Sequence, residues 1–175
     1  MYKVAYISLA IVLLMQFSCR NPYRVKKNNN VFRVTQQSYL YFKNVRSFYY
    51  HREDVANGEI RNYYHKDLLN YEKIPPVYAQ ISHNWREDEA YLIVRIPDSL
   101  SESPVFYLNN GEEIKYNPFP DSQLVLGTMI AEAIQKKGNI NWSIDGDIIP
   151  LFENQKQEDL FELTVRDYKR LTNQE

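Results

Sequence analysis

Residues 105–116 read VFYLNNGEEIKY, and this stretch is the strongest local signal in the 175-residue chain. Two short runs of β-forming residues surround Asn109-Asn110-Gly111. An Asn-Gly pair tolerates the positive φ angles that a tight hairpin turn demands. The stretch therefore predicts an antiparallel β-hairpin made of residues 105–108 and 112–116.

Strands and turns alternate on both sides of this hairpin. Two apolar runs, 77–82 and 90–96, follow Pro75-Pro76 and are joined by a polar turn, which predicts a second hairpin. Helices are predicted where apolar residues recur at helical spacing, as Tyr39, Phe42, Val45 and Phe48 do. This first helix is expected to be capped by Thr35 and to end before residues 54–58, with a strand as the alternative because the stretch is rich in β-formers. The other expected elements are a strand over 60–65, a helix over 122–137, a hairpin of 141–144 and 147–152 around Asp145-Gly146, and a helix over 156–171.

The chain from residue 34 onward is expected to form one domain. The whole chain has 44% hydrophobic and 25% charged residues, which is sufficient for a packed core and differs from the composition of disordered chains. Frequent hairpin turns and few helical crossovers favour an antiparallel arrangement of strands. We therefore predict a single α+β domain over residues 34–175, with a mostly antiparallel sheet of hairpins and two or three helices packed on one side.

The N-terminus has the pattern of an export signal. Lys3 is the only charged residue among the first 19, and an almost uninterrupted apolar run covers residues 4–17. This run is shorter than the roughly 20 residues that cross a bilayer as a helix. It fits the apolar region of a secretory signal instead. The chain's only cysteine, Cys19, follows directly after the small residue Ser18.

This arrangement resembles a bacterial lipoprotein signal. The residues just before the cysteine depart from the commonest lipoprotein consensus but are similar to the looser consensus of Bacteroidota lipoproteins. The resemblance covers only the first 19 residues. It implies that residues 1–18 are removed and that Cys19 begins the mature chain, with lipid on its thiol and usually on its amine. Several acyl chains, at about 0.8 kcal/mol per buried methylene, would hold the protein durably at a membrane.

The charge distribution divides the rest of the chain into a basic stalk and an acidic body. Residues 20–33 carry five basic residues and no acid, whereas residues 34–175 hold 15 basic and 22 acidic residues, a net charge of −7. Residues 19–33 are expected to form a lipidated basic stalk that lies against anionic headgroups or stays solvated as a linker. Surface-exported Bacteroidota lipoproteins typically carry an acidic stretch at this place. The resemblance therefore implies a periplasm-facing domain on the outer membrane, rather than on the inner membrane or the cell surface.

Familiar catalytic and cofactor motifs are missing from the sequence. The three histidines, His51, His65 and His83, lie 14 and 18 residues apart, which is not a zinc-ligand spacing. The five glycines are too scattered to form a phosphate-binding loop, and the acidic body disfavours nucleic acid. We therefore expect no metal, no cofactor, no nucleotide or nucleic-acid partner and no catalytic residues.

Fifteen tyrosines are the strongest anomaly of the composition. Aromatic residues are enriched in protein interfaces and among their energetically dominant contacts. We interpret Tyr49, Tyr50, Tyr63, Tyr64 and Trp85 as a candidate interaction surface. The alternative is a tyrosine-rich core and strand surface with no binding role.

The predicted lipid anchor, the small size of the domain and the lack of catalytic motifs predict a protein that binds other molecules rather than catalysing a reaction. In layout it resembles small lipoproteins that serve as subunits of envelope-spanning machines such as secretion systems. This resemblance implies a protein partner in the envelope. Two alternatives stay open: a carbohydrate-binding or scavenging lipoprotein that stacks Tyr and Trp on sugar rings, and a small hydrolase. The hydrolase would use carboxylates clustered at predicted turns, which are Glu87-Asp88-Glu89, Glu112-Glu113, and Asp145 with Asp147.

Overall fold

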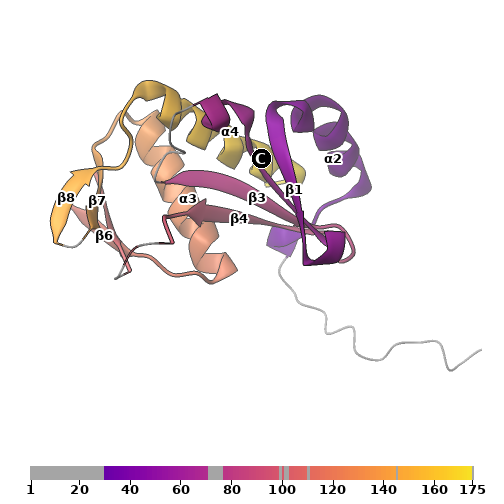
Figure 1. The fold of residues 1–175 in the computed structure, drawn as a ribbon, viewed down its shortest axis with the longest axis horizontal. Coiled ribbons are helices and arrows are strands. Elements are labelled where there is room, and N and C mark those ends of the chain that lie inside the picture. The colour runs from indigo at the N-terminus through magenta and orange to yellow at the C-terminus, as the bar shows by residue number, and fades with distance from the viewer. Residues whose placement is uncertain are drawn as a thin grey trace, which may run out of the picture. The chain divides into compact units, whose positions relative to one another are not determined.

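The structure, a computed structural model, describes residues 30–70, 77–98, 100, 103–109, 111–144 and 146–174. The predicted signal peptide, Cys19 and most of the predicted stalk lie outside these residues. From Val31 onward the described residues belong to one unit, with three α-helices and two four-stranded antiparallel sheets (Figure 1). The fold class is α+β, as predicted. The strands are divided between two sheets where the sequence predicted one.

The first sheet is an antiparallel meander. It contains, in spatial order, β1 (Tyr50–Val55), β2 (Ile60–His65), β3 (Tyr78–Asn84) and β4 (Glu89–Arg95). The predicted strand over 60–65 and the hairpin that follows it are confirmed. The sequence does not predict β1, which lies at the edge of the sheet, pairs only with β2, and buries only Tyr50 fully. A strand with so little buried surface has no apolar alternation to reveal it.

The second sheet is built from the two other predicted hairpins. Its spatial order is β6 (Glu112–Lys115), β5 (Val105–Leu108), β7 (Ile140–Ile144) and β8 (Asp147–Pro150). The turn between β5 and β6 has positive φ at Asn109 (50°) and Gly111 (98°), as the Asn-Gly signal predicts. Both hairpins are therefore confirmed.

The helical segments begin and end close to the predicted residues. They are α2 (Gln36–Tyr41), α3 (Pro120–Gln135) and α4 (Gln155–Leu171), with five short turns named η1 (Asn30–Phe32), η2 (Phe42–Arg46), η3 (Ser47–Tyr49), η4 (Ala56–Gly58) and η5 (Lys66–Asn70). Proline at the first position of α3 begins that helix, since its missing N–H is not needed there. The predicted helix capped by Thr35 is helical from Gln36 to Tyr49, but it passes from α geometry through a π turn at η2 to a 3₁₀ turn at η3, and β1 follows at Tyr50.

Helices α3 and α4 pack against β3 and β4, and they form the main core with the first sheet (Figure 1). Alternate residues of β4, namely Ala90, Leu92 and Val94, are fully buried at this contact. Gly127 allows α3 to approach closely, because a Cβ placed there would lie 2.5 Å from Leu92 Cδ2. Two helices therefore cover one face of the first sheet, as the sequence predicted.

Candidate functional site

A pocket opens between the start of α2, strands β2 and β3, and the turn from β3 to β4. Its cavity volume is about 350 Å³, which is within the range of small-molecule sites. Both ionisable and aromatic side chains line it. The lining residues are Val34, Thr35, Gln36, Tyr39, Arg61, His83, Trp85 and Asp88.

Backbone and capping hydrogen bonds hold the α2 side of this pocket in place. The Val34 N–H donates to the Asp88 carbonyl over 2.8 Å, which joins the chain before α2 to the turn from β3 to β4. Thr35 caps α2, because its Oγ1 accepts from the Ser38 N–H over 3.2 Å. The Ser38 hydroxyl in turn donates to the Leu171 carbonyl over 2.7 Å, which fixes α2 to the end of α4.

Arg61 and His83 form the floor of the pocket as direct neighbours across β2 and β3. One terminal guanidinium nitrogen of Arg61 donates to the Tyr39 hydroxyl over 3.0 Å. The Tyr39 ring lies 5.0 Å from the His83 ring, centroid to centroid. The pocket thus combines a fixed cation with two rings from separate elements.

Trp85 forms an exposed wall of the same pocket. Its indole Nε1–H donates to the Gly58 carbonyl over 2.6 Å, and the Arg61 guanidinium lies 5.3 Å from its ring centroid. The Arg86 guanidinium also lies over this ring, 5.7 Å from its centroid. With the N–H satisfied, the 41% of Trp85 that remains exposed is ring surface rather than an unpaired donor.

Burial controls the protonation of His83. The side chain is 3% exposed, and desolvation, followed by the positive charge of Arg61, lowers the pKa of His83 to about 4. The carboxylate of Asp88 acts in the opposite direction but is outweighed. His83 is therefore neutral at pH 7.

Two buried polar atoms beside the pocket have no hydrogen-bond partner among the described residues. They are His83 Nδ1 and Arg61 Nε. Arg61 Nε lies 4.0 Å from Asp54 Oδ1, a distance that permits charge attraction but no hydrogen bond. A buried donor or acceptor without a partner costs about 1 to 3 kcal/mol. Neither atom is accessible to solvent, so a ligand reaches them only if neighbouring side chains move.

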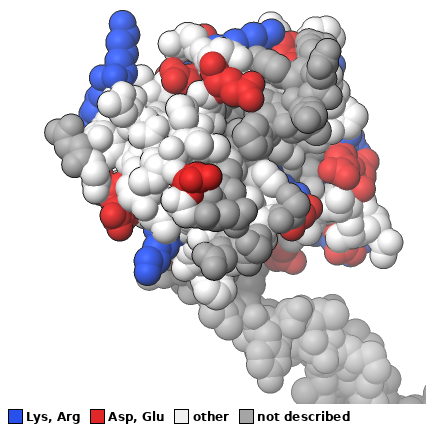
Figure 2. Space-filling view, turned by 60° about the vertical axis from the view of Figure 1, so that its left-hand side comes forward, with Lys and Arg blue, Asp and Glu red and all other residues white. Residues whose placement is uncertain are grey.

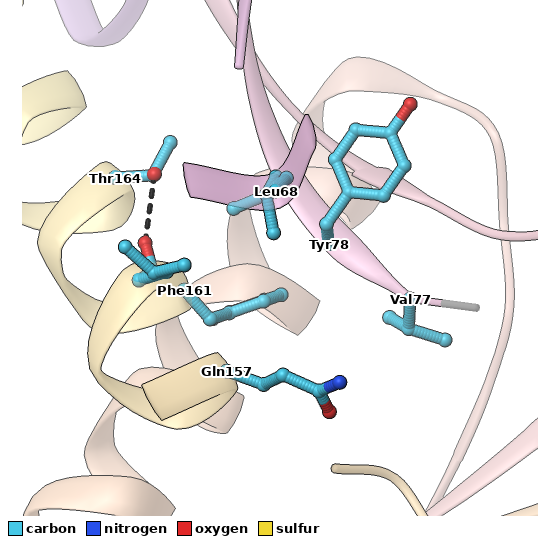
Figure 3. A pocket seen from close by; sticks show the side chains of 8 residues that line it. Leu68, Val77, Tyr78, Gln157, Phe161 and Thr164 are labelled. Carbon is cyan, nitrogen blue, oxygen red and sulfur yellow. Dashed lines mark hydrogen bonds between the residues drawn. The ribbon is translucent and has the colours of Figure 1, made fainter. Parts of the chain in front are cut away.

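A second pocket, shown in Figure 3, lies between η5, β3 and α4 and is too small for a ligand. Its cavity volume is about 10 Å³, which is room for about one water molecule. The Thr164 hydroxyl beside it already donates to the Leu160 carbonyl over 2.8 Å. Leu68, Val77, Tyr78, Gln157, Phe161 and Thr164 surround it in the figure. We interpret it as a small packing gap of the core.

The aromatic residues selected from the sequence do not form one surface. Tyr50 and Tyr63 are buried, at 3% and 5% exposure, and both rings contact Phe42. Tyr64 points to the opposite face of the sheet from Tyr63, because side chains alternate along a strand. It contacts His51 and Tyr78 there.

Only two of the five selected residues are clearly exposed. Trp85 lines the pocket, and Tyr49, at 47% exposure, lies at η3 against His65. The sequence therefore indicates one member of the pocket, Trp85, and does not indicate Tyr39, Arg61 or His83. The signal that would find Arg61 and His83 is the pairing register of β2 with β3, which alternation within one strand does not give.

A second surface feature is an exposed apolar patch, which we define as Leu40, Tyr41, Val45, Phe48 and Tyr49. Each of these side chains is at least 44% exposed, and Phe48 is 75% exposed. The helical spacing from Tyr39 to Phe48 does not give a single buried stripe. The reason is that a π turn holds more residues per turn than an α turn, so η2 rotates the following side chains relative to buried Phe42.

The apolar patch has basic and no acidic neighbours in its own segment, since residues 40–49 contain Lys43 and Arg46 but no carboxylate. The Arg46 guanidinium lies 4.9 Å from the Tyr49 ring centroid. The Lys66 ammonium lies at the same distance, 4.9 Å, from the Phe48 ring centroid. Arg46 is neutralised by its ion pair with Asp167 at 2.9 Å, so Lys43 and Lys66 supply the positive charge beside the patch.

The carboxylates considered for a hydrolase do not converge in the described residues. Glu87 and Asp88 lie at the turn from β3 to β4 and Glu89 begins β4, whereas Glu112 and Glu113 lie on β6 of the other sheet. Asp145 lies outside the described residues. Within the described part of the chain, no three His, Cys, Asp or Glu side chains are grouped so that they could hold a metal ion.

Charge is dispersed on the face that Figure 2 shows. Acidic and basic side chains are interspersed among uncharged residues there, without a continuous field of one sign. Phosphate binding needs a concentrated basic surface, which the described residues on this face do not offer. Among the described helices, none combines the length and apolarity that a bilayer-crossing segment needs.

Comparisons with known proteins leave the site to be interpreted from its own geometry. The chain matches no protein-family model, no curated protein and no solved structure.

Proposed function

We propose that the protein is a lipid-tethered, non-enzymatic binding subunit of the bacterial cell envelope, anchored through Cys19 and facing the periplasm from the outer membrane. The observation that carries the proposal is the apolar patch. Five large apolar side chains are exposed within ten residues of a body with net charge −7. Concentrated exposed apolar surface of this kind marks an interaction site.

The chemistry of the apolar patch indicates its partner. Interfaces bury an apolar centre within a polar rim, and complementary charge across the rim favours the correct partner. Lys43 and Lys66 lie at the edge of the patch, so a complementary partner would place carboxylates opposite them. The proposed partner is an envelope protein with an apolar surface bordered by acidic residues.

Replacing Phe48 with glutamate is expected to weaken partner binding at least about tenfold, because a charge would enter the centre of an apolar interface. The partner is first trapped in intact cells by a photo-crosslinking phenylalanine analogue at position 48. Its affinity for the wild type and for Phe48→Glu is then compared after purification. Phe119, 70% exposed at the start of α3, provides the matched control, since Phe119→Glu adds the same charge outside the patch.

Equal losses for Phe48→Glu and Phe119→Glu would contradict the proposal. If the apolar patch binds lipid headgroups instead of a protein, a different result is expected. In that case the wild type, but not Phe48→Glu, would bind vesicles of phosphatidylethanolamine and phosphatidylglycerol without any partner. That result also contradicts a protein-binding role.

Replacing Cys19 with serine is expected to move the protein from the membrane fraction to the soluble fraction. The reason is that the acyl chains attached at Cys19 supply most of the membrane affinity in the proposed arrangement. Fractionation and mass spectrometry of the wild type and of Cys19→Ser measure both the location and the mass of the attached lipid. A Cys19→Ser variant that stays with membranes at the native mature size would rule out the tether.

A further inference from the structure

We propose that the pocket of Tyr39, Arg61, His83, Trp85 and Asp88 is a binding site for a neutral saccharide. This site is separate from the apolar patch. The site is formed by residues of α2, β2, β3 and the turn from β3 to β4.

The rings of the pocket suit a ligand with an apolar face. The electron-rich face of an aromatic ring attracts groups with partial positive charge, and the C–H face of a sugar ring is such a group. Trp85 is partly exposed, and its hydrogen bond to the Gly58 carbonyl fixes the indole before a ligand arrives. A ring held in this way loses little conformational entropy on binding.

The polar atoms of the pocket suit hydroxyl groups. The Arg61 guanidinium can only donate hydrogen bonds, Asp88 can only accept them, and neutral His83 and Gln36 each offer both functions. A hydroxyl donates and accepts at once, so adjacent hydroxyls of one sugar match this mixture of donors and acceptors.

The charges of the pocket argue against an ionic ligand. Arg61 supplies a cation, but Asp54 lies 4.0 Å from its Nε and Asp88 forms part of the rim. His83 adds no charge at pH 7. Arg86, whose guanidinium lies 5.7 Å from the Trp85 ring centroid, adds a second cation, but it is paired with Glu59 at 2.7 Å. Neither sign of charge therefore dominates around the pocket, so an uncharged ligand experiences the least repulsion.

The direct test measures saccharide binding with the two tryptophans as reporters. Trp142 is fully buried and Trp85 is 41% exposed, so protection from acrylamide quenching reports Trp85. The probes are hexasaccharides of β-1,4-glucose, α-1,4-glucose, mannose, xylose, galactose and N-acetylglucosamine, with hexagalacturonate as the anionic comparison. We expect at least one neutral probe to bind with a Kd of about 1 mM or tighter.

Variants then assign the binding to this pocket, using saturation-transfer NMR as a readout that does not need Trp85. Trp85→Ala is expected to weaken binding at least about tenfold, and Trp85→Phe, which keeps a ring, to weaken it less. Gln36→Leu changes only an exposed lining residue, so it tests the site even if Trp85→Ala is poorly folded. Gln36→Leu is also expected to weaken binding, while Phe119→Ala leaves it unchanged.

Three results would overturn the proposal: no neutral probe bound at 10 mM, binding of hexagalacturonate alone, or equal affinity of the wild type and the two pocket variants. Phe48→Glu separates this proposal from the protein-binding role. It is expected to lose the partner and to keep saccharide binding, so each proposal can fail without the other.

Discussion

Replacing Asp167 with alanine is expected to lower the free energy of unfolding by about 3 to 5 kcal/mol, the cost typical of breaking a buried ion pair from one side. Asp167 on α4 is fully buried, and its carboxylate accepts from Arg46 Nε at 2.9 Å and from the Tyr50 hydroxyl at 2.7 Å. Removal leaves a largely buried cation and a buried hydroxyl without their partner. Urea unfolding followed by circular dichroism measures the loss.

The matched control for this prediction is another Arg–Asp pair in the same protein. Arg52 and Asp54 also form an ion pair, but both side chains are exposed, at 49% and 44%. Solvent screens such a pair, so Arg52→Ala should change stability much less than Asp167→Ala. Similar losses for the two variants would show that burial of the Arg46–Asp167 pair does not determine its contribution.

A double replacement separates the ion pair from the packing around it. Arg46→Met together with Asp167→Leu is expected to recover most of the stability that Asp167→Ala loses, because apolar residues of similar size often replace a buried pair without loss. Tyr50 then loses its acceptor. Its pKa is held well above the ordinary tyrosine value, first by burial and then by the charge of Asp167. Tyr50→Phe added to the double variant should therefore restore the remainder.

The same three residues connect stability to the proposed binding surface. Arg46 ends η2 and Tyr50 begins β1, so their bonds to Asp167 hold both ends of η3, which carries Phe48 and Tyr49. We therefore expect hydrogen exchange in Asp167→Ala to accelerate first in residues 40–50. Local opening there would disturb the apolar patch before the rest of the domain unfolds.

The sequence predicts those parts of the fold whose signals are local. The hairpin at Asn109–Gly111 depends on residues in the turn itself, and the C-terminal helix α4 depends on apolar spacing within one segment. Edge strand β1 has no such signal, since one buried residue cannot mark a strand. The π turn at η2 is also invisible in the sequence, because apolar spacing does not reveal where a helix changes its pitch.

The candidate pocket depends on contacts between distant segments, which explains why the sequence identifies only Trp85. Arg61 and His83 are 22 residues apart and meet through strand register, and Tyr39 reaches them from a helix before the sheet. The assignment of the adjacent residues Tyr63 and Tyr64 to one interaction surface is wrong for a related reason. Neighbours along a strand face opposite sides, so a run of aromatic residues in sequence cannot form a single aromatic surface.

Lowering the pH from about 6.5 to 4 is expected to remove about 3 kcal/mol of stability through His83 alone. The pKa of His83 is lowered to about 4 in the folded protein, first by burial and then by Arg61, whereas the unfolded histidine titrates near 6.5. Between these two values the unfolded chain binds a proton that the folded chain does not bind. The free energy of unfolding therefore rises with pH between about 4 and 6.5. Above this range the stabilisation that depends on neutral His83 is fully present, and below it this contribution changes no further.

Other groups titrate over the same range, so the measurement compares two proteins at each pH. The pKa of His65 is also lowered, mainly by burial, and together with the carboxylates it contributes equally to the wild type and to His83→Gln. The difference in unfolding free energy between the two proteins isolates His83. This difference should shift by about 3 kcal/mol against the wild type between pH 7 and pH 4. Parallel curves would mean that His83 is protonated in the folded state near pH 6.5. Below about pH 6.5, a neutral hydrogen-bonding group at the floor of the saccharide pocket would then be replaced by a second cation beside Arg61, which a neutral ligand does not match.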